Sequence, residues 1–437
     1  MDWAHKLVHA HAICLLVLRC AAESLMGASR FNARLAAVLF ALVSAGLSIV
    51  LISLGKVVLA ATTLVVVLLG WRQRWKAANW QQMWTPRIAL TIVFVFALSL
   101  IWTSAPLHQA LGAVGKYGKF LVIPCLLVLI RTRREAEWAV LAFLLAQAFL
   151  LCSSWLLFFH VPLVWATSHM ALGNFSVFSS YLDQGIMSAT MAAVFWHLKA
   201  LAPNRPMFYA AVVLSLLALG LAFMVFIGRT GYLVAAVMVS LAIFWALPGR
   251  YRLVSLLVPP MVAVIAVLGV ESVAQRVSFT KSEIVAYSSG IGSATSADNR
   301  LDFWKGSAQA IAEKPWLGSG VGSWATEYNR VVGIKFPGHQ ALGIGGNPHQ
   351  EYFLWGVQLG VGGIVLLLAF FAAAMVDFSK MERSIFRAGL SVLAALATAC
   401  LFNSSIYDAY IGDFFCLSLG VLLAYGSSRP TAPPAVA

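Results

Sequence analysis

Long hydrophobic runs alternate with short polar loops along most of the chain. Each run has the length and apolar character of a helix that crosses or nearly crosses a bilayer. They lie at 35–54, 57–71, 88–103, 119–131, 137–159, 184–203, 207–227, 231–248, 252–270, 353–375, 387–405 and 408–425. The pattern predicts an all-α, polytopic membrane protein with about twelve transmembrane helices.

One long polar segment, roughly 271–352, interrupts this pattern. Within it, Asp302–Glu313 has the spacing of a short amphipathic helix, and Pro315–Gly322 reads as a glycine-rich turn. A loop of about eighty residues without a disordered composition is usually functional. We therefore expect four regions. They are nine transmembrane helices in 1–270, a partly helical loop bearing the active site in 271–352, three further transmembrane helices in 353–426, and a disordered tail in 427–437.

Composition supports the membrane assignment. The chain of 437 residues is 61% hydrophobic and only 11% charged, whereas a soluble domain has about a quarter charged residues. All six cysteines lie in apolar runs, so the sequence contains neither a disulfide framework nor a zinc-binding spacing.

The net charge of +14 is distributed in a way that argues against nucleic-acid binding. Basic residues recur in alternate short loops, as the positive-inside rule requires if the N-terminus is cytoplasmic. These inner loops contain Arg72, Arg74 and Lys76; Arg131, Arg133 and Arg134; Lys199 and Arg205; Arg250 and Arg252; and Lys380, Arg383 and Arg387. We expect both termini on the cytoplasmic side and the long polar loop on the outer side.

The unusual charges gather at the outer ends of the predicted spans. Arg229 lies in the short turn Gly228–Gly231, and Arg300 lies at the start of the loop helix. Lys116 and Lys119 are three residues apart, on one face of a helix that enters from outside. Plainer interpretations remain open, in which Arg229 and the two lysines anchor their helices at lipid headgroups and Arg300 forms an ion pair with a neighbouring aspartate.

His349 closes the polar segment, in the sequence Asn-Pro-His-Gln-Glu-Tyr over 347–352. Asn347 suits a helix N-cap, Pro348 the first helical position and Gln350 the capping-box position. This places His349 in the first turn, where the helix dipole disfavours imidazolium and keeps the ring neutral. The plainer alternative is an interfacial histidine that is hydrogen-bonded locally.

Together these residues suit a site for an anionic, lipid-linked donor. Arginines donate bidentate hydrogen bonds to phosphate, and a neutral histidine can take a proton from an attacking hydroxyl. Supporting roles are open to Gln184, Glu351 and Tyr352. No Asp/Glu pair with metal-like spacing appears on the outer side, so we favour charge stabilisation by arginine over a metal.

At this point the sequence resembles a known family. The order of Gly228-Arg-Thr-Gly, Arg300, Pro315-Trp-Leu-Gly-Ser-Gly-Val-Gly and Asn347-Pro-His-Gln-Glu-Tyr, all on the outer side, is similar to that of the O-antigen ligase and polymerase superfamily. The resemblance is densest over 220–365 and elsewhere extends only to topology.

The resemblance implies a GT-C-like membrane glycosyltransferase of the bacterial inner membrane with its active site facing the periplasm. It implies transfer of O-antigen from undecaprenyl diphosphate to a sugar hydroxyl of lipid A–core, with inversion and without metal, nucleotide or other cofactor. His349 is then the catalytic base, and Arg229 and Arg300 bind the donor diphosphate. The topology adds Lys116 and Lys119 to the expected donor-binding residues.

Alternatives differ in acceptor or in class. An O-antigen polymerase and a protein O-oligosaccharyltransferase use the same donor chemistry, and short motifs encode the acceptor poorly. A cell-shape glycan polymerase would need a loop carboxylate, for which Asp298, Asp302 and Glu351 are candidates. A lipid-linked sugar transporter or flippase would instead show inverted repeats, broken helices and charges at the membrane midplane.

Overall fold

The computed structural model describes residues 33–70, 82–269, 296–335 and 346–428, with isolated positions between 271 and 282. The residues described are folded into helices and loops, with no strand among them, and the predicted all-α class is confirmed. Most of the predicted tail 427–437 lies outside the described residues.

Within the described residues, nine helical segments are long and apolar enough to cross a membrane, fewer than the twelve predicted. They are α3 (Ile49–Gly70), α4 (Trp84–Leu98) with η2 (Ser99–Ile101), α5 (Leu107–Tyr117) with η3 (Gly118–Leu121) and α6 (Val122–Leu129), α7 (Arg133–Phe158), α10 (Arg205–Gly220) with η5 (Leu221–Val225), α11 (Arg229–Ala246), α16 (Glu351–Ser379), α17 (Arg383–Cys400) and α18 (Ala409–Ser427).

At the other three predicted spans, the structure has helices that do not meet this standard of length and hydropathy. The first is α2 (Ala33–Ser44), which is apolar but short, and the second is α9 (Tyr181–Leu198), which is buried along most of its length. The third is the irregular pair η6 (Gly249–Leu257) and α12 (Val258–Gly269). In the part of the chain that the structure describes, the hydrophobic pattern therefore located a helix at every one of these positions, although not always one long and apolar enough to cross a membrane.

Two predicted boundaries were wrong. The chain turns between α2 and α3 at 45–48 rather than at 55–56. There Gly46 lies so close to α7 that a Cβ atom would be 2.2 Å from the Ala146 carbonyl oxygen. The fourth predicted span begins at Leu107 instead of 119, because the polar residues before 119 are helical and Lys116 and Lys119 have partners inside the protein.

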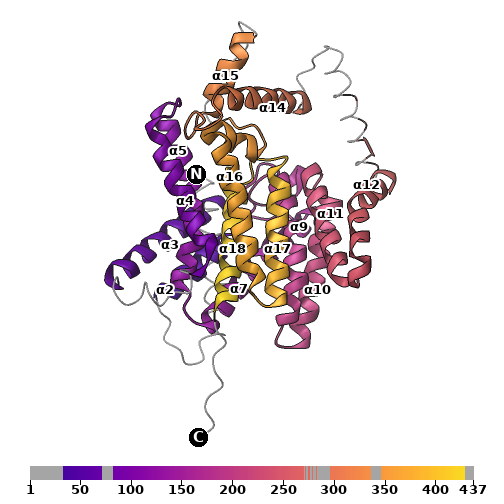
Figure 1. The fold of residues 1–437 in the computed structure, drawn as a ribbon. Coiled ribbons are helices and arrows are strands. Elements are labelled where there is room, and N and C mark those ends of the chain that lie inside the picture. The colour runs from indigo at the N-terminus through magenta and orange to yellow at the C-terminus, as the bar shows by residue number, and fades with distance from the viewer. Residues whose placement is uncertain are drawn as a thin grey trace.

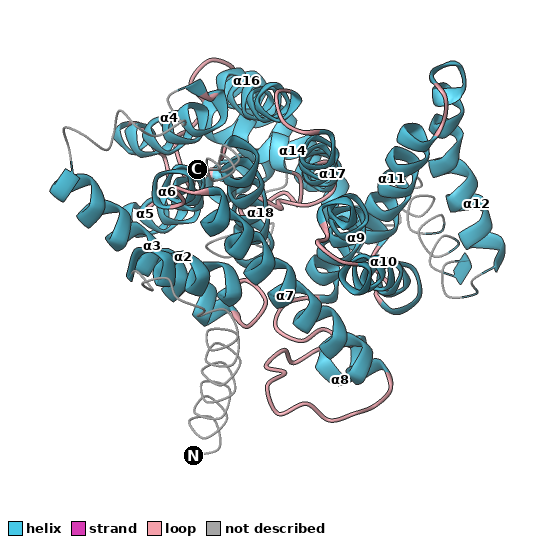
Figure 2. Ribbon diagram, turned by 90° about the horizontal axis from the view of Figure 1, so that it is seen from below, coloured by secondary structure: helices cyan, strands magenta, loops and turns pink. Residues whose placement is uncertain are grey.

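Helix α18 lies at the centre of the bundle, where it packs against α6, α7 and α17 (Figure 2). Nearly all of α18 is buried, which suits its apolar sequence on every face. Helix α9 holds a second position of this kind, packed between α10, α11 and α17. Many apolar side chains on the outer helices remain exposed, as expected where lipid would cover them.

The described part of the polar loop forms two helices, α14 (Ser296–Glu313) and α15 (Trp324–Lys335). Helix α14 lies across one end of the bundle above α16, and α15 projects away from the bundle at the same end (Figure 1). The sequence predicted helix over 302–313, and the helix begins six residues earlier. Helix α14 packs on both α15 and α16. The loop is therefore a folded cap on the membrane helices.

The glycine-rich turn 315–322 joins this cap to the bundle. Gly318, Gly320 and Gly322 all have positive φ, at 61°, 83° and 76°. The turn pairs with α16, where the backbone N–H groups of Ser319 and Gly320 donate to the carbonyls of residues 357 and 358 at 2.9 and 2.8 Å. Side chains would collide at these positions, so glycine is required for both conformation and space.

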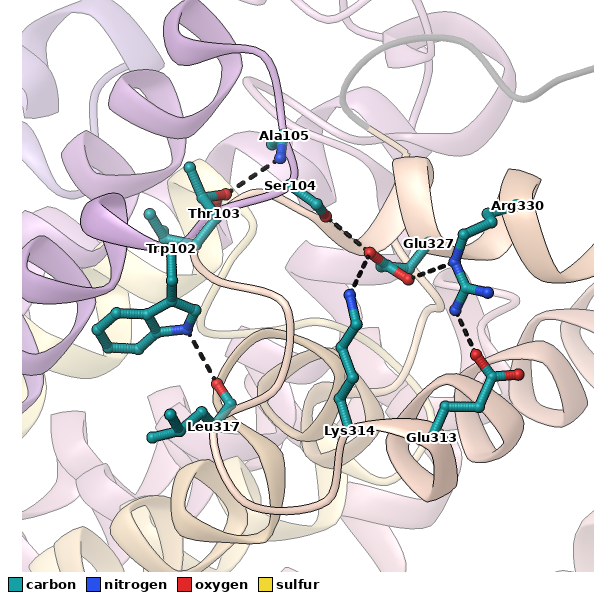
Figure 3. A network of polar contacts seen from close by, with 10 residues as sticks. Trp102, Thr103, Ser104, Ala105, Glu313, Lys314, Leu317, Glu327 and Arg330 are labelled. Carbon is teal, nitrogen blue, oxygen red and sulfur yellow. Dashed lines mark hydrogen bonds and ion pairs between the residues drawn. The ribbon is translucent and has the colours of Figure 1, made fainter.

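A charged network fastens the other side of the cap (Figure 3). The Glu327 carboxylate on α15 accepts from Ser104 Oγ at 2.8 Å and from Lys314 Nζ at 3.1 Å, and its second oxygen accepts from Arg330 Nε at 2.8 Å. Arg330 also pairs with Glu313 at 2.5 Å. Ser104 belongs to the α4–α5 connection, so the network ties both cap helices to the membrane bundle.

Candidate functional site

The start of α16 differs from the predicted capping pattern. The N-cap is Gln350, whose side-chain oxygen accepts from the Phe353 backbone N–H at 2.6 Å, and the helix begins at Glu351. Asn347 instead accepts the His349 backbone N–H at 2.9 Å, which turns the chain before the helix. The prediction that His349 lies in the first helical turn is therefore wrong. The Gln350 side chain caps the helix, and the Asn347 side chain instead hydrogen-bonds the backbone of His349 before the helix begins.

His349 itself adopts a left-handed backbone conformation, with φ of 50°. Such conformations are uncommon outside glycine and cluster at functional sites. The residue before it is also fixed, since Trp304 Nε1 of α14 donates to the Pro348 carbonyl at 3.1 Å. The Phe303 ring lies 6.4 Å from the imidazole ring. Helix α14 thus packs directly against the segment that presents His349.

The α17–α18 connection, residues 401–408, forms another wall of the site. Its Phe402 carbonyl accepts a hydrogen bond from Arg300 Nη1 at 3.2 Å. Asn403 in the same connection acts to raise the pKa of His349. One short connection therefore acts on both the histidine and one of the arginines that the sequence singled out.

Arg229 approaches from α11. Its helix begins at Arg229 itself and packs closely on α9, because Gly228 lies against Leu182 and Gly231 lies against Gly185. A Cβ atom at Gly231 would be 3.3 Å from the Gly185 backbone. The Gly-Arg-Thr-Gly sequence therefore brings the start of α11 to the start of α9.

Charge couples the three residues. Burial and the positive charge of Arg229 lower the pKa of Arg300. The half-buried guanidinium of Arg300 also interacts with Tyr181 at the start of α9. Burial and the charge of Arg300 lower the pKa of His349 below its usual 6.5, and Asn403 partly opposes this. The ring is therefore neutral at neutral pH. Burial and the neighbouring Arg300 cation account for the lowered pKa.

The two lysines of the sequence prediction have different positions. Lys116 is half-buried, with its ammonium 3.8 Å from the centre of the Tyr407 ring. Lys119 is only 2% exposed, and its ammonium donates to the Asp408 carbonyl at 2.6 Å. Burial raises the pKa of Asp408 to about 6, with both lysines opposing this shift. Lys119 therefore fastens the α17–α18 connection from beneath, and Lys116 is the lysine nearer the surface.

The three supporting candidates make internal contacts. Glu351 is 0% exposed, and its carboxylate accepts from Trp355 Nε1 at 2.8 Å and from the backbone N–H groups of Ile406 and Tyr407 at 2.9 and 3.2 Å. Gln184 is 2% exposed and bonds to the 177–178 backbone and to a serine of α7. Tyr352 donates to the Ala397 carbonyl at 3.4 Å.

Other charged groups lie on or near the site without forming a metal centre. Among the described residues, no group of three or more His, Cys, Asp or Glu side chains could hold a metal ion. Asp302 is exposed on α14, and the Asp298 side chain lies outside the described part of the chain. Among the described residues, Arg300 is the cation that acts on His349, Arg229 acts on Arg300, and Lys116 interacts with Asp408.

Sequence reasoning missed the α17–α18 connection. Phe402 contributes a backbone carbonyl and Asn403 an uncharged amide, so neither has a charge or spacing that a motif search would select. Asp408 carried a signal, since it is an acidic residue at the outer end of a predicted span. Its contact with Asn347, at 3.5 Å, places it at the edge of the site.

These features define an α-helical, multi-pass membrane protein with a helical cap at one end of its bundle and a candidate site in which two arginines and a neutral histidine are coupled. Residues 210–368 match the family model described as O-antigen ligase, and this match confirms the resemblance to the superfamily of O-antigen ligases and polymerases. The matched region contains Arg229, Arg300 and His349, but it does not contain Lys116 or Lys119. No curated protein matches the chain. The family supports lipid-linked polysaccharide substrates in a membrane environment.

Proposed function

We propose that the protein is an O-antigen ligase of the bacterial inner membrane. It transfers O-antigen polysaccharide from undecaprenyl diphosphate to a sugar hydroxyl of lipid A–core. In this proposal the termini are cytoplasmic, and the cap of α14 and α15 faces the periplasm. The basic loops at the other end of the helices support this orientation.

The proposal depends mainly on one observation, the meeting of Arg229, Arg300 and His349. Arg229 comes from α11, Arg300 from α14 and His349 from the segment before α16. The charge of Arg229 nevertheless acts on Arg300, and the charge of Arg300 acts on His349. Two arginines beside a neutral imidazole are the groups that a diphosphate leaving group and an attacking hydroxyl need. An ordinary surface arginine has no reason to lie half-buried beside a second cation.

The proposed reaction is a single displacement at the anomeric carbon of the first O-antigen sugar. His349 takes the proton of the acceptor hydroxyl as its oxygen forms the new bond to that carbon. The bond from the carbon to the diphosphate oxygen breaks, and its electron pair leaves with undecaprenyl diphosphate. Arg229 and Arg300 stabilise the charge that develops there, and the configuration at the carbon inverts.

The remaining assignments follow from the contacts. Lys116, on the same side as Asp408, extends the cationic surface toward the donor. Lys119, Gln184, Glu351 and Tyr352 support the fold around the site, since their polar atoms bond within the protein. We propose that no metal takes part, because the arginines provide the positive charge that the leaving group requires.

A transfer assay with purified protein tests the proposal. Undecaprenyl diphosphate-linked glycan and lipid A–core are incubated with the parent, with His349→Ala and with His169→Ala, whose exposed histidine lies in the α7–α9 connection. We expect a size-shifted lipid product from the parent and His169→Ala, and a loss of about 100-fold or more with His349→Ala. Substantial turnover by His349→Ala would remove that residue from the base role.

The same assay separates the alternatives. Glycan that lengthens on its carrier without reaching lipid A–core indicates the polymerase. Glycan found on an added acceptor protein indicates the O-oligosaccharyltransferase. If no bond is formed and labelled lipid-linked sugar crosses a reconstituted bilayer, the protein is a transporter. A carboxylate mechanism receives no support from Glu351, which three buried donors already occupy.

A further inference from the structure

A group of basic side chains lies at the end of the bundle opposite the cap, where α9 and α11 end and α17 begins. The other ends of these helices carry the candidate site, since α11 starts at Arg229 and α17 leads to the Phe402 carbonyl that Arg300 contacts. We call this group the distal basic cluster. It consists of Lys199, Arg250, Arg252, Arg383 and Arg387.

Aromatic rings at the ends of α9 and α11 contact these cations. The Arg387 guanidinium carbon lies 5.7 Å from the centre of the Trp245 ring, and the His197 ring packs edge-on against the same tryptophan at 4.8 Å. The Arg252 guanidinium carbon lies 5.4 Å from the centre of the neighbouring Phe244 ring. One tryptophan thus joins α9, α11 and α17, and the adjacent phenylalanine adds η6 to the same group.

Further contacts fix the segments that carry the cluster. Lys199 Nζ lies 2.8 Å from the centre of the Trp196 ring, at the end of α9. Ser240 Oγ of α11 donates to the Ser255 carbonyl of η6 at 2.6 Å, and Ser255 Oγ donates to the Arg252 carbonyl at 2.7 Å. The cations therefore project from elements that are bonded to one another, and few of their orientations remain to be lost when a ligand binds.

Acidic residues are missing from this part of the sequence. No Asp or Glu occurs over 184–270 or over 383–407. Among the described residues, none of the five cations lies within 4.0 Å of a carboxylate. At the same end of the bundle, by contrast, Arg133 pairs with Glu137 at 3.5 Å and with Glu382 at 3.9 Å. The positive-inside rule explains basic loops, but it does not explain why the charges gathered here lack the acidic partners that Arg133 has.

A buried histidine lies beside these cations. His197 is 7% exposed, and its Nε2 atom has no hydrogen-bond partner among the described residues. Buried polar atoms nearly always have a partner, so this nitrogen, next to several uncompensated cations, points to an anion that the protein does not itself supply. A neutral imidazole can donate one hydrogen bond to a phosphate oxygen.

Apolar side chains of η6 indicate which kind of anion binds. Leu253, Leu256 and Leu257 are all more than half exposed, and they lie in the same short segment as Arg252. Leucines in this position can contact acyl chains while the arginines contact a headgroup at the membrane surface. A small soluble anion would use the charges alone, whereas an anionic phospholipid uses both surfaces.

We propose that the distal basic cluster binds the phosphate group of an anionic phospholipid, in the leaflet on the side away from the cap, with Arg252 and Arg387 as its principal donors. Guanidinium groups donate paired hydrogen bonds to phosphate oxygens, and basic pockets between transmembrane helices bind anionic headgroups. The lipid joins α9, α11 and α17 at the ends remote from His349. The proposal does not depend on the proposed glycosyl transfer.

The test measures lipid binding by the full chain in a nonionic detergent. Native mass spectrometry counts bound dioctanoyl phosphatidylglycerol, and a thermal scan gives the rise in Tm that the lipid produces. Dioctanoyl phosphatidylcholine, which has no net charge, and inorganic phosphate are run beside it. The variants are Arg252→Gln and Arg387→Gln. The matched control is Arg134→Gln, because Arg134 lies 5.1 Å from the Trp138 ring at the same end of the bundle but outside the cluster.

We expect the parent to bind one phosphatidylglycerol about tenfold more tightly than phosphatidylcholine, and inorganic phosphate more weakly than either lipid. Each cluster variant should bind phosphatidylglycerol about fivefold more weakly, the loss expected for one basic residue beside an anionic lipid. The rise in Tm should shrink with the affinity. Arg134→Gln loses the same charge and should match the parent.

Equal phosphatidylglycerol affinity in the parent, Arg387→Gln and Arg252→Gln would overturn the proposal. Arg252 is exposed, so Arg252→Gln provides this test even if Arg387→Gln does not fold. An equal loss in Arg134→Gln would also overturn it, because the effect would then reflect net charge alone. Equal affinity of the parent for the two lipids would exclude recognition of an anionic headgroup. A rise in Tm with inorganic phosphate as large as that with the lipid would overturn the assignment to a phospholipid.

Discussion

Gly320 is the position where the cap of α14 and α15 meets the α4–α5 connection most closely. Its φ is +83°, and a Cβ atom there would lie 2.3 Å from Thr103 Cα and 2.6 Å from Thr103 Cβ. Thr103 cannot easily retreat, because its hydroxyl donates to the Val321 carbonyl at 2.7 Å and the next residue pairs with Ser319. Gly320→Ala should therefore separate the turn from the bundle.

The expected loss has two parts. An ordinary Cβ contact is 3.4–4 Å, so Thr103 would have to move by about 1 Å. Overpacking of that kind costs about 1–3 kcal/mol. Alanine in a left-handed conformation adds about 1–2 kcal/mol. The docked turn should lose about 2–5 kcal/mol, and about 2 kcal/mol already makes the undocked state roughly 30-fold more populated.

Limited chymotrypsin digestion after Trp316, within the turn, measures this population when opening is fast relative to cleavage. Gly320→Ala should be cut about 30-fold faster than the parent, and it should lose transfer activity because the cap carries Arg300. The matched control is Gly333→Ala on α15, where a Cβ atom meets nothing within 4 Å. It should be neutral or slightly stabilising. Equal cutting rates for Gly320→Ala and the parent would refute the reasoning.

Further predictions concern the site. Arg300→Lys should weaken donor binding and turnover, because an ammonium group cannot reproduce the planar hydrogen-bonding fork of a guanidinium. The control Arg205→Lys, at the far end of α10, should change neither. Unchanged donor affinity and turnover in Arg300→Lys would count against diphosphate binding by Arg300. Arg300→Gln removes a charge that lowers the pKa of His349, so the acid limb of kcat/KM should move to higher pH; a shift the other way contradicts the electrostatic account. Glu351→Ala leaves three buried donors unpaired, at about 1–3 kcal/mol each, and should lower the apparent Tm by several degrees in a thermal scan. Transfer should continue in excess chelator, and a loss restored by a divalent ion would require a metal.

The hydrophobic pattern predicted the helices well because a bilayer permits little besides apolar helices. It failed where polar residues are satisfied inside the protein. Leu107–Tyr117 contains a histidine, a glutamine and Lys116, which made it look like a loop. The Lys116 ammonium lies over the ring of Tyr407, which is 291 positions later in the chain, so no local sequence pattern contains this contact.

The site was predictable where chemistry concentrates in a side chain. Arg229, Arg300 and His349 are charged or titratable residues at the outer ends of helices, and the structure brings them together. Asn403 could not be found in this way, since an amide becomes informative only once its neighbour is known. Glu351 is the opposite case, because this conspicuous carboxylate is fully buried and supports the α17–α18 connection.

The interruption of α16 at Gly360, where φ is 67° and ψ is −159°, affects how the protein can be assembled. At this break the Val361 N–H donates to the Pro315 carbonyl, and the carbonyls of residues 357 and 358 accept from the glycine-rich turn. Backbone groups of a membrane helix thus depend on a segment that is made earlier and that, in the proposed orientation, is exported first. Until that segment has folded back, α16 has unpaired groups near the lipid, at several kcal/mol each. In that orientation, completion of this helix has to wait for translocation of the cap, and a chain that stalls between the two steps exposes unpaired backbone groups.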